Sequence, residues 1–554
     1  MRIRCQYSTA PIPVGADVRR SRAQQDGAAW EPMNGVFLIN TPIYGGVGVI
    51  GTETVSNGFS SLSYAAAPPS MGVLMRKLVP TVPFIGRQAF QKPNGVSTLQ
   101  GSVLIIVLWI ALGLVTLALY FAQSMNFEQR ASDNRVSAQA ADQAIEGAVR
   151  YVNYLLSTQI ANGSNGCVPD PNGYAREAVP VGDARFWLIG RDTNTPVGPG
   201  TLYCGLVDEG SKLNLNLPTP SNAIVWLPRM TTELTQAILD WRDTNGSGPT
   251  VMYYGMQQPS YQCKSDPFET VDELRLVYGA TMDILVGEDI NRNGILDASE
   301  TDENQNNLLD PGILEYFTVY SREPNANKVL INPANVNTGG PLDTLLRKAV
   351  GAARANQILA RIRPAGGGGA GRGTNVVVSP PVPFASPLQF YLRASSGSGG
   401  MTSAEFAQIC TNLTTVPTNR PYMEGRVNVN TASAAVLACL LNGDTAAAQQ
   451  LVNYRRVNST SLGSIAWVID ALGQNSSTAI ASLQSWDNIT TQSYQFTADV
   501  AALGPHGRGY RRVKFVFDTS SGTPQIVYRQ DLTQLGWALG KEARQKWLLA
   551  KGNG

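Results

Sequence analysis

One uncharged, apolar run limits what this chain can fold into more than any other feature. Residues 102–122 (SVLIIVLWIALGLVTLALYFA) form a stretch of 21 residues without a charged side chain. A helix of roughly 20 apolar residues is long enough to cross the hydrocarbon core of a bilayer. No proline interrupts the segment from Gln123 to Leu156, so we expect the helix to continue well beyond the membrane. The chain is therefore predicted to join one membrane helix to a large water-soluble region.

Basic residues on one side of this run predict its orientation. Between Met75 and the span there are four positive charges, at Arg76, Lys77, Arg87 and Lys92, and no acid. Because positive charge is enriched on the cytoplasmic side of membranes, we expect the bulk of the chain to be exported. A signal peptide would have a shorter apolar core followed by a cleavage site of small residues, so the span is predicted to stay as an anchor. Residues 1–74 are predicted to be a disordered leader or an over-extended start.

Composition narrows the classes of function. The 43 Lys and Arg residues against 41 Asp and Glu give a net charge of +2, which argues against a protein built mainly to hold nucleic acid. A catalytic triad or a histidine-bound zinc would depend on the single histidine, His506. Six scattered cysteines include no CxxC pair, and a disulfide among Cys167, Cys204 and Cys263 is one alternative in an exported region. We therefore expect a non-enzymatic protein.

Periodic patterns predict how the first and last parts of the soluble region fold. Apolar and small side chains recur at helical intervals after the span and indicate one buried stripe, at Phe127, Ala131, Asn134, Ala138, Ala141, Ile145, Ala148, Val152 and Leu155. A strand is predicted at 184–189. Two further strands, at 511–518 and 525–531, are separated by SSGTP and are predicted to form a hairpin.

Three internal repeats occupy the middle of the chain. Each opens with two asparagines around an apolar residue, at Asn214/Asn216, Asn335/Asn337 and Asn428/Asn430, and each closes on a helical arginine, at Arg242, Arg361 and Arg455. The spacings of 26, 24 and 25 residues predict one helix–turn–helix unit used three times. Thr338 and Thr431 suit the capping of the first helix. A glycine run at 366–373 lacks the ending of a phosphate-binding loop and is predicted to be flexible.

The strongest local motif is a twelve-residue loop at 289–300 (DINRNGILDASE). Side-chain oxygens occupy positions 1, 3, 5, 9 and 12, glycine occupies position 6, and position 7 offers its carbonyl, as in an EF-hand calcium loop. This spacing lets six or seven oxygens converge on one hard cation. We predict a calcium site over the alternative of an Asn-rich turn, with the ligands Asp289, Asn291, Asn293, Ile295, Asp297 and Glu300.

A second loop follows directly and repeats the same beginning. Its predicted ligands are Asp302, Asn304, Asn306, Leu308 and Asp310. Asn307 stands where glycine would be, and asparagine tolerates the left-handed conformation. Position 12 is Ile313, so the closing carboxylate is expected to come from Glu315 or from the first loop. An exported protein would meet abundant calcium, which favours a structural role for both ions over sensing.

The repeats also suggest helix-hairpin-helix units, some of which bind DNA phosphates through backbone amides. The hairpins here, at 227–231 and 441–445, lack paired glycines, and Asp444 would repel a phosphate. Without a basic surplus, a protein-packing scaffold is favoured over nucleic-acid binding.

Taken together, residues 101–545 resemble the K-type minor pseudopilins of bacterial type II secretion systems. The stretches 267–279 (PFETVDELRLVYG) and 425–432 (GRVNVNTA) are especially similar. In that family a prepilin peptidase cuts after a glycine and methylates the new N-terminus. The resemblance therefore implies cleavage between Gly101 and Ser102.

The resemblance also implies a position in the filament. Ile106 stands where most pilins carry a glutamate, and K-type pseudopilins lack that glutamate, which implies a place at the tip. The residue before the cleavage glycine is Gln100, whereas the family has a basic residue there.

The implied fold is α+β, in which a long N-terminal transmembrane helix packs on a small antiparallel pilin-like sheet that carries a large α-helical insertion. The implied divisions are a leader at 1–100, a transmembrane assembly helix at 101–123, the pilin-like helix and first strands at 124–210, the insertion with its repeats and calcium loops (289–312) at 211–470, the last strands at 471–545, and a tail at 546–554.

The implied function is that of a calcium-loaded minor pseudopilin in the bacterial inner membrane, with one membrane pass and its bulk in the periplasm. Its expected partners are other minor pseudopilins, the inner-membrane secretion platform and the prepilin peptidase, and no nucleic acid is expected. Two alternatives stay open at this point: a membrane-anchored helix-hairpin-helix DNA receptor and a minor pilin of a type IV pilus.

Overall fold

The computed structural model describes residues 100–193, 202–217, 223–332, 339–362, 383–473, 477–541 and Ala543. By its internal contacts the chain divides into two units between Ala118 and Leu119. Three features discussed above lie outside the described residues, namely most of the leader, the Asn335–Asn337 doublet with Thr338, and the glycine run at 366–373.

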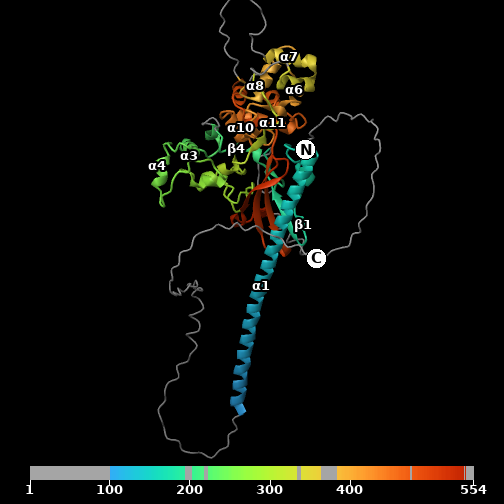
Figure 1. Ribbon diagram of the computed structural model, residues 1–554. Coiled ribbons are helices and arrows are strands. Elements are labelled where there is room, and N and C mark those ends of the chain that lie inside the picture. Colours follow the sequence, from blue (N-terminus) through green and yellow to red (C-terminus); the bar gives the residue numbers. More distant parts are fainter. Residues whose placement is uncertain are drawn as a thin grey trace, which may run out of the picture. The chain divides into compact units, whose positions relative to one another are not determined.

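A single helix carries the apolar run. Helix α1 spans Gln100–Ala161, a length of 62 residues (Figure 1). Among the described residues it is the one helix long and apolar enough to cross a membrane, with a mean hydropathy of 2.7 in its most apolar window and none of that window buried. The predicted span is thus confirmed in length and composition, and the helix continues without a break after it.

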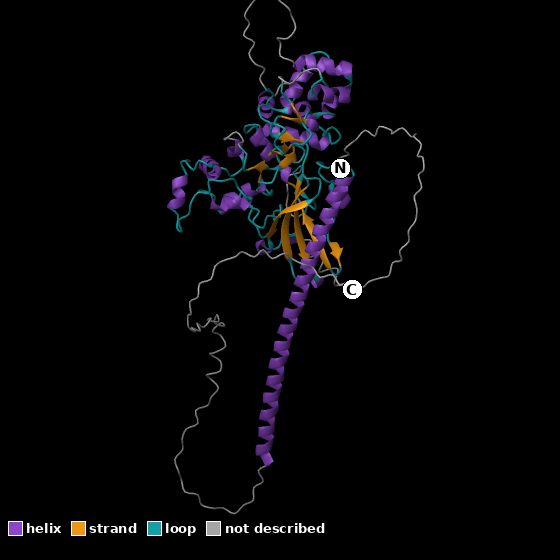
Figure 2. Cartoon of the chain, viewed as in Figure 1, coloured by secondary structure: helices purple, strands orange, loops and turns teal. Residues whose placement is uncertain are grey.

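The last part of α1 packs on an antiparallel sheet (Figure 2). The strand order is β1-β2-β12-β13-β14, and β3 also pairs with β12. Their bounds are Val179–Val181 for β1, Ala184–Ile189 for β2, Val207–Asp208 for β3, Gln495–Leu503 for β12, Arg511–Asp518 for β13 and Gln525–Asp531 for β14. The three strands predicted from sequence are confirmed at these bounds, and the α+β fold with its antiparallel sheet is confirmed with them.

Side chains alternate across each strand, so the two faces of the sheet differ. One face carries Val500, Phe515 and Phe517, which pack against apolar residues of α1 in a single core. The opposite face carries Thr497, Asp499, Arg512 and Lys514 toward the segments inserted between β3 and β12. The hydrophobic face anchors α1, and the polar face anchors the insertion.

Burial of α1 begins later than the periodicity predicted. Phe127 is 68% exposed, whereas the buried stripe starts at Ser137 and ends at Leu156 in place of Leu155. Two glycines after β12 explain the starting point, because a Cβ added to Gly504 or Gly509 would come within 2.1–2.4 Å of the Ser137 backbone. The sequence pattern shows that the helix is amphipathic, but the position of the sheet decides which turns are covered.

The insertion is mostly helical. Besides α2 (Pro171–Tyr174), which precedes it, the shorter helices are α3 (Thr232–Arg242), α4 (Val251–Gly255), α5 (Met282–Val286), α6 (Pro341–Val350), α7 (Ala352–Ile362), α8 (Pro387–Ser395), α9 (Ser403–Ala407), α10 (Ala434–Leu440), α11 (Thr445–Val457), α12 (Trp467–Leu472) and α13 (Ser477–Gln484). One contiguous hydrophobic core runs through them. An antiparallel pair, β6 (Arg322–Pro324) with β9 (Tyr422–Glu424), links segments far apart in sequence.

Each repeat is closed by a short parallel pair of strands. The pairs are β4 (Leu213–Asn214) with β5 (Phe317–Thr318), β7 (Val329–Leu330) with β8 (Leu413–Thr414), and β10 (Val427–Asn428) with β11 (Ile489–Thr490). In every pair a threonine ends the second strand, and its hydroxyl accepts a hydrogen bond at 3.1 Å from the backbone N–H two residues later. The three units therefore share their closure as well as their opening.

This register corrects the assignment of the second repeat. Leu215, Ile331 and Val429 each donate a backbone hydrogen bond to the carbonyl of the closing threonine, at 2.9–3.0 Å. Ile331 thus corresponds to Leu215 and Val429, which lie between the two asparagines of the first and third repeats. The doublet predicted at 335–337 therefore lies too far along the chain to open the second repeat. The strand ladder selects this register, and the sequence pattern alone could not, because asparagine also follows at 335 and 337.

The closing arginines have two different roles. Arg242 and Arg455 each donate to the carbonyl between the two asparagines of their own repeat, Leu215 and Val429 respectively. Arg361 instead donates to the carbonyls of Ser396 and Ser398. The predicted equivalence of the three arginines is therefore wrong for the second repeat, which uses its arginine to hold a neighbouring turn.

Asp208 fastens the insertion to the sheet from the end of β3. Its side chain is 5% exposed and accepts hydrogen bonds from Gly210 N, Asn428 Nδ2, Thr431 Oγ1 and Ser493 Oγ at 2.5–3.0 Å. Asn428 opens the third repeat, so this carboxylate ties the repeat to the sheet through groups that water cannot reach.

The adjacent Glu209 does the same for the first repeat. Its carboxylate accepts from Lys212 at 3.0 Å, from the Thr318 hydroxyl at 2.6 Å and from the Thr497 hydroxyl of β12 at 2.7 Å. Burial opposes its ionisation, but the charges of Lys212 and Lys514 and these hydrogen bonds outweigh burial and lower the pKa of Glu209 to about 2.

This lowered pKa predicts a dependence of stability on pH. The folded-state pKa lies below the ordinary value of 4.5, so the contribution of Glu209 is complete above pH 4.5 and is lost as the pH falls toward 2. In acid denaturation of the full chain in detergent, Glu209→Gln is expected to flatten the fall of unfolding free energy in that window by up to about 1.4 kcal/mol per pH unit. The exposed control Glu128→Gln is expected to follow the wild type, and parallel wild-type and Glu209→Gln curves would contradict the assignment.

The structure forms no disulfide among the cysteines that it describes. The alternative of a bond among Cys167, Cys204 and Cys263 is therefore not realised. Cys410 and Cys439 are buried, and burial raises the pKa of each thiol to about 12.

Candidate metal centre

The first predicted loop is wound as an EF-hand loop requires. The two Asp289 carboxylate oxygens accept from the N–H groups of Asn293 and Gly294, both at 2.9 Å. The side-chain oxygens of Asn291 and Asn293 accept from the N–H groups two residues later, at 3.0 and 2.8 Å. Arg292 and Gly294 have positive φ values of 56° and 78°. These bonds turn the side-chain oxygens of positions 1, 3 and 5 toward the inside of the loop.

The second loop repeats this winding bond for bond. Asp302 accepts from the N–H groups of Asn306 and Asn307 at 3.2 and 2.8 Å. Asn304 and Asn306 accept from the N–H groups two residues later, at 3.0 and 2.6 Å. Asn307 adopts a φ of 57°, so asparagine does take the left-handed position that glycine fills in the first loop. The matching geometry shows that the two loops are the same structural unit.

The side chains of each loop converge on its ninth residue. In the first loop, the amides of Asn291 and Asn293 reach one oxygen of Asp297 at 2.7 and 2.8 Å. In the second, the amides of Asn304 and Asn306 reach one oxygen of Asp310 at 2.6 and 3.0 Å. Each loop thus gathers two asparagine amides around one carboxylate.

The closing carboxylates come from two places. Glu300 accepts from the N–H groups of Asn291 and Asp297, at 3.3 and 3.0 Å, as predicted for position 12 of the first loop. The second loop is closed by Glu288, whose oxygens accept from the N–H groups of Glu303 at 2.8 Å and Asp310 at 2.9 Å. Glu288 therefore has, in the second loop, the position that Glu300 has in the first.

The two expected sources of this second carboxylate are corrected by the structure. Glu315 is paired with Arg191 at 2.9 Å, and Ile313 lies fully buried in the core. Glu288 lies one residue before the first loop, and an antiparallel bridge between Gly287 and Pro311 brings it beside the second. No spacing rule of a twelve-residue loop could find a ligand that precedes both loops.

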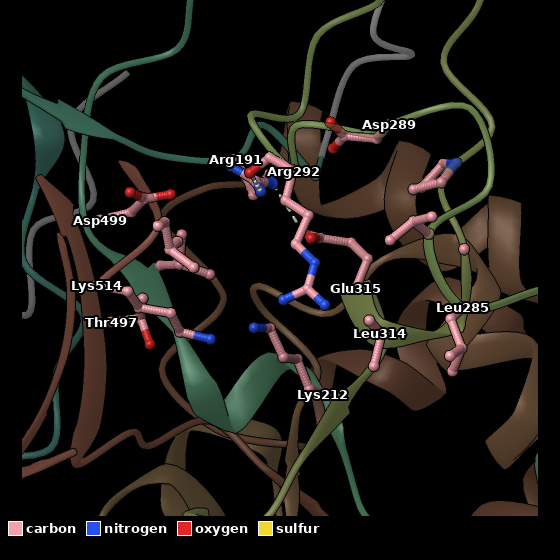
Figure 3. A pocket seen from close by; sticks show the side chains of 15 residues that line it. Arg191, Lys212, Leu285, Asp289, Arg292, Leu314, Glu315, Thr497, Asp499 and Lys514 are labelled. Carbon is pink, nitrogen blue, oxygen red and sulfur yellow. Dashed lines mark hydrogen bonds and ion pairs between the residues drawn. The ribbon is translucent and has the colours of Figure 1, made fainter. Parts of the chain in front are cut away.

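Two arginines hold the first loop in place, Arg512 of β13 and Arg191, which follows β2 and is labelled in Figure 3. Arg512 donates to the carbonyls of Asn291 and Arg292, and Arg191 donates to those of Arg292 and Asn293. Gly294 allows this approach, because a Cβ there would come within 2.7 Å of the Arg191 side chain. These bonds to three loop carbonyls fix the loop backbone to the sheet and to the segment after β2.

The electrostatics of the first loop suit a bound cation. Burial raises the pKa of Asp289, against the nearby charge of Arg191, and burial also raises the pKa of Glu300. A positive ion would keep both carboxyl groups ionised. In the described ranges no three His, Cys, Asp or Glu side chains are arranged to hold a metal on their own. The loop also carries amide and carbonyl oxygens, which belong to the oxygen ligands of a hard cation such as calcium.

The two loops differ in their surroundings. Asp289, Asn291, Asn293 and Ile295 are buried, with Ile295 1% exposed, whereas Leu308 in the second loop is 37% exposed. The predicted processing residues Gly101 and Ser102 lie within α1, which begins at Gln100. Their side chains are outside the described part of the structure.

Comparison with known proteins finds a similar chain among the solved structures. No model of a known protein family matches the sequence, and no curated protein matches it either. A chain in the crystal structure of the GspK-GspI-GspJ complex from the enterotoxigenic Escherichia coli type 2 secretion system is similar over 73% of this chain and 99% of that chain, with 10% sequence identity and a TM-score of 0.36.

Proposed function

We propose that this chain is a minor pseudopilin at the tip of a type II secretion pseudopilus, where it supports initiation of the filament and protein export. Helix α1 carries the proposal. Its first part is uncharged and unburied over a membrane-spanning length, and its last part is packed on a small antiparallel sheet. One helix thus serves as anchor and as the spine of a folded domain, which suits a subunit that leaves the bilayer to enter a filament.

The insertion supports a position at the end of a filament. It occupies the chain between β3 and β12 and has its own continuous core. A body of this size beside the sheet would obstruct a subunit stacked on it. Ile106 agrees with this position, because the carboxylate that other pilins place there is missing. We propose other minor pseudopilins, the inner-membrane secretion platform and the prepilin peptidase as partners.

Calcium, in this proposal, is a structural ion in both loops. Asp289, Asn291, Asn293, Ile295, Asp297 and Glu300 would hold the first ion, and Asp302, Asn304, Asn306, Leu308, Asp310 and Glu288 the second. A bound ion would supply positive charge that keeps the carboxylates ionised and their oxygens converged. Arg191 and Arg512 connect the first loop to the sheet, so the loop and the sheet would be stabilised together.

The role of Glu288 gives a test of this assignment by calorimetry. Full-length wild type in detergent is expected to bind two calcium ions, and Glu288→Gln is expected to weaken one of them by at least about tenfold. Glu300→Gln should weaken the other. Glu303→Gln is the matched control, because Glu303 belongs to the second loop but its side chain is 54% exposed and pairs with Arg229. Two ions bound with unchanged affinity in Glu288→Gln would remove this residue from the site.

The hairpins support packing over DNA binding. The Asp444 carboxylate caps α11 by accepting from Ala447 N at 2.9 Å, so the helix end that could receive a phosphate already holds an anion. A Cβ at Gly443 would come within 2.5 Å of the Trp226 ring, so the hairpin glycine serves protein contact. These two contacts weigh against the DNA-receptor alternative.

An export assay in the native host separates these functions. Deletion of the gene is expected to stop the export of secreted proteins, and expression of the full chain should restore it. DNA uptake should be unaffected. Normal export together with lost DNA uptake would contradict the proposal and favour the receptor.

A further inference from the structure

A small, charged cavity lies between the polar face of the sheet and the insertion. Its volume is about 60 Å³. Thr497, Asp499 and Lys514 line it from the sheet, and Leu285 and Leu314 line it from the insertion (Figure 3). Room for a few water molecules is present, but a lipid headgroup or a nucleotide would not fit.

Two lysine ammonium groups face each other in this cavity (Figure 3). Lys212 is paired with Glu209 at 3.0 Å. The ammonium group of Lys514 makes no hydrogen bond or ion pair with any residue in the described ranges. Burial lowers the pKa of Lys514, and repulsion by Lys212 lowers it further. A confined ammonium group with three unused donors is costly, and a second cation beside it increases the cost.

The carboxylates near the cavity are already committed to other groups. Both oxygens of Asp499 accept from Arg512, and both oxygens of Glu209 are bonded to Lys212 or to threonine hydroxyls. Glu315 is paired with Arg191, and Asp289 accepts from backbone N–H groups of its loop. The protein therefore surrounds Lys514 with negative charge but offers it no acceptor.

Arg191 and Arg292 also line the cavity, and each is paired, with Glu315 and Asp272 respectively. Four cations and three acids form the lining, and Asp499 among those acids is neutralised by Arg512, which lies outside the lining. Lys212 is likewise neutralised by Glu209 and Arg292 by Asp272, both outside the lining, so the cavity has no net positive charge and the unrelieved repulsion is confined to the lysine pair.

We propose that this cavity binds a small free oxyanion, phosphate or sulfate, between the ammonium groups of Lys212 and Lys514. Water could accept hydrogen bonds from Lys514, but only an anion also removes the repulsion between the two lysines. A tetrahedral oxyanion has enough acceptors for both ammonium groups, and its size matches the cavity. The site joins β12 and β13 to the segment after β3, so the bound ion stabilises the contact between sheet and insertion.

Thermal unfolding of the full chain in detergent tests this site with inorganic phosphate and sulfate as probes. Sodium chloride at matched ionic strength is the reference. Saturating phosphate is expected to raise the Tm of the wild type by about 2–4 °C over chloride. Lys514→Met keeps the aliphatic stem and is expected to abolish the shift. Lys348→Met, at an exposed position on α6, should retain it.

Two results would overturn the proposal. One is a wild-type Tm that is no higher in phosphate or sulfate than in chloride, which would mean that the cavity holds water. The other is an equal phosphate shift in Lys514→Met, which would place the ion elsewhere. If Lys514→Met fails to fold, the wild type and Lys348→Met still decide whether a saturable oxyanion site exists. Lys514→Gln, which keeps a donor but removes the charge, is then expected to weaken it by roughly tenfold, and an unchanged affinity would count against the cavity.

Discussion

Replacing Arg512 by alanine is expected to lower the free energy of unfolding by about 3–5 kcal/mol. Arg512 has no exposed surface, and its guanidinium forms two hydrogen bonds with Asp499, at 2.9 and 2.6 Å. The substitution leaves a buried carboxylate without its partner and frees the carbonyls of Asn291 and Arg292. Chemical denaturation of the full chain in detergent, followed by tryptophan fluorescence, measures this loss.

The neighbouring arginine provides a matched control. Arg511 lies on the same strand with its side chain 38% exposed and forms an ion pair with Asp142, which is 58% exposed, at 3.2 Å. Exposed pairs of this kind are worth about 0–1 kcal/mol, so Arg511→Ala should change little. The two substitutions remove the same side chain one residue apart, so equal losses would contradict the role given to the buried pair.

A second large effect is expected from Asp208→Ala, a loss of about 3 kcal/mol. The change removes the acceptor of four hydrogen bonds and leaves donors on Asn428 and Ser493 unsatisfied at 0% and 2% exposure. Because these groups join the third repeat to the sheet, separate unfolding transitions for the insertion and the sheet should appear in calorimetry.

Asp183→Ala is the control for this experiment, since Asp183 is exposed in the turn between β1 and β2. Its effect is expected to stay within about 0.5 kcal/mol. Asp208→Asn tests the role of the charge alone. It keeps the size of the side chain but can place an amide nitrogen against the Nδ2 donor of Asn428. If Asp208→Ala is as stable as the wild type, the four hydrogen bonds to Asp208 do not stabilise the fold.

Local patterns were enough to predict the elements near both ends of the fold. The apolar run of α1 needs only length and the absence of charge. Strand β2 and the hairpin of β13 and β14 follow from alternation and a turn of small polar residues, and they occur at the predicted residues. These features depend on neighbours in sequence, which a single chain displays directly.

The contacts that organise the centre could not be predicted in this way. Asp208 and Asn428 are 220 residues apart, and Arg512 is 221 residues from Asn291. Nothing in the local sequence of Asp208, Glu209 or Arg512 distinguishes it from an exposed charge. The second repeat was displaced for the same reason, because the strand ladder with Thr414 selects its register.

The metal centre lies between these two cases. The first loop and the left-handed Asn307 were found because loop spacing is local, and occupancy by calcium stays a prediction. Glu288 was missed because its place in the second loop depends on the bridge between Gly287 and Pro311. A search that allowed a ligand from before the first loop would have included it.

The most direct test of the proposed function is the N-terminus of the mature protein. The full chain, expressed in its native host and extracted from the membrane, can be sequenced from its N-terminus and weighed by mass spectrometry. The pseudopilin assignment predicts a start at Ser102 with one added methyl group, and Gly101→Val should block this cleavage. A mature protein that retains the residues before Gly101 would contradict the assignment.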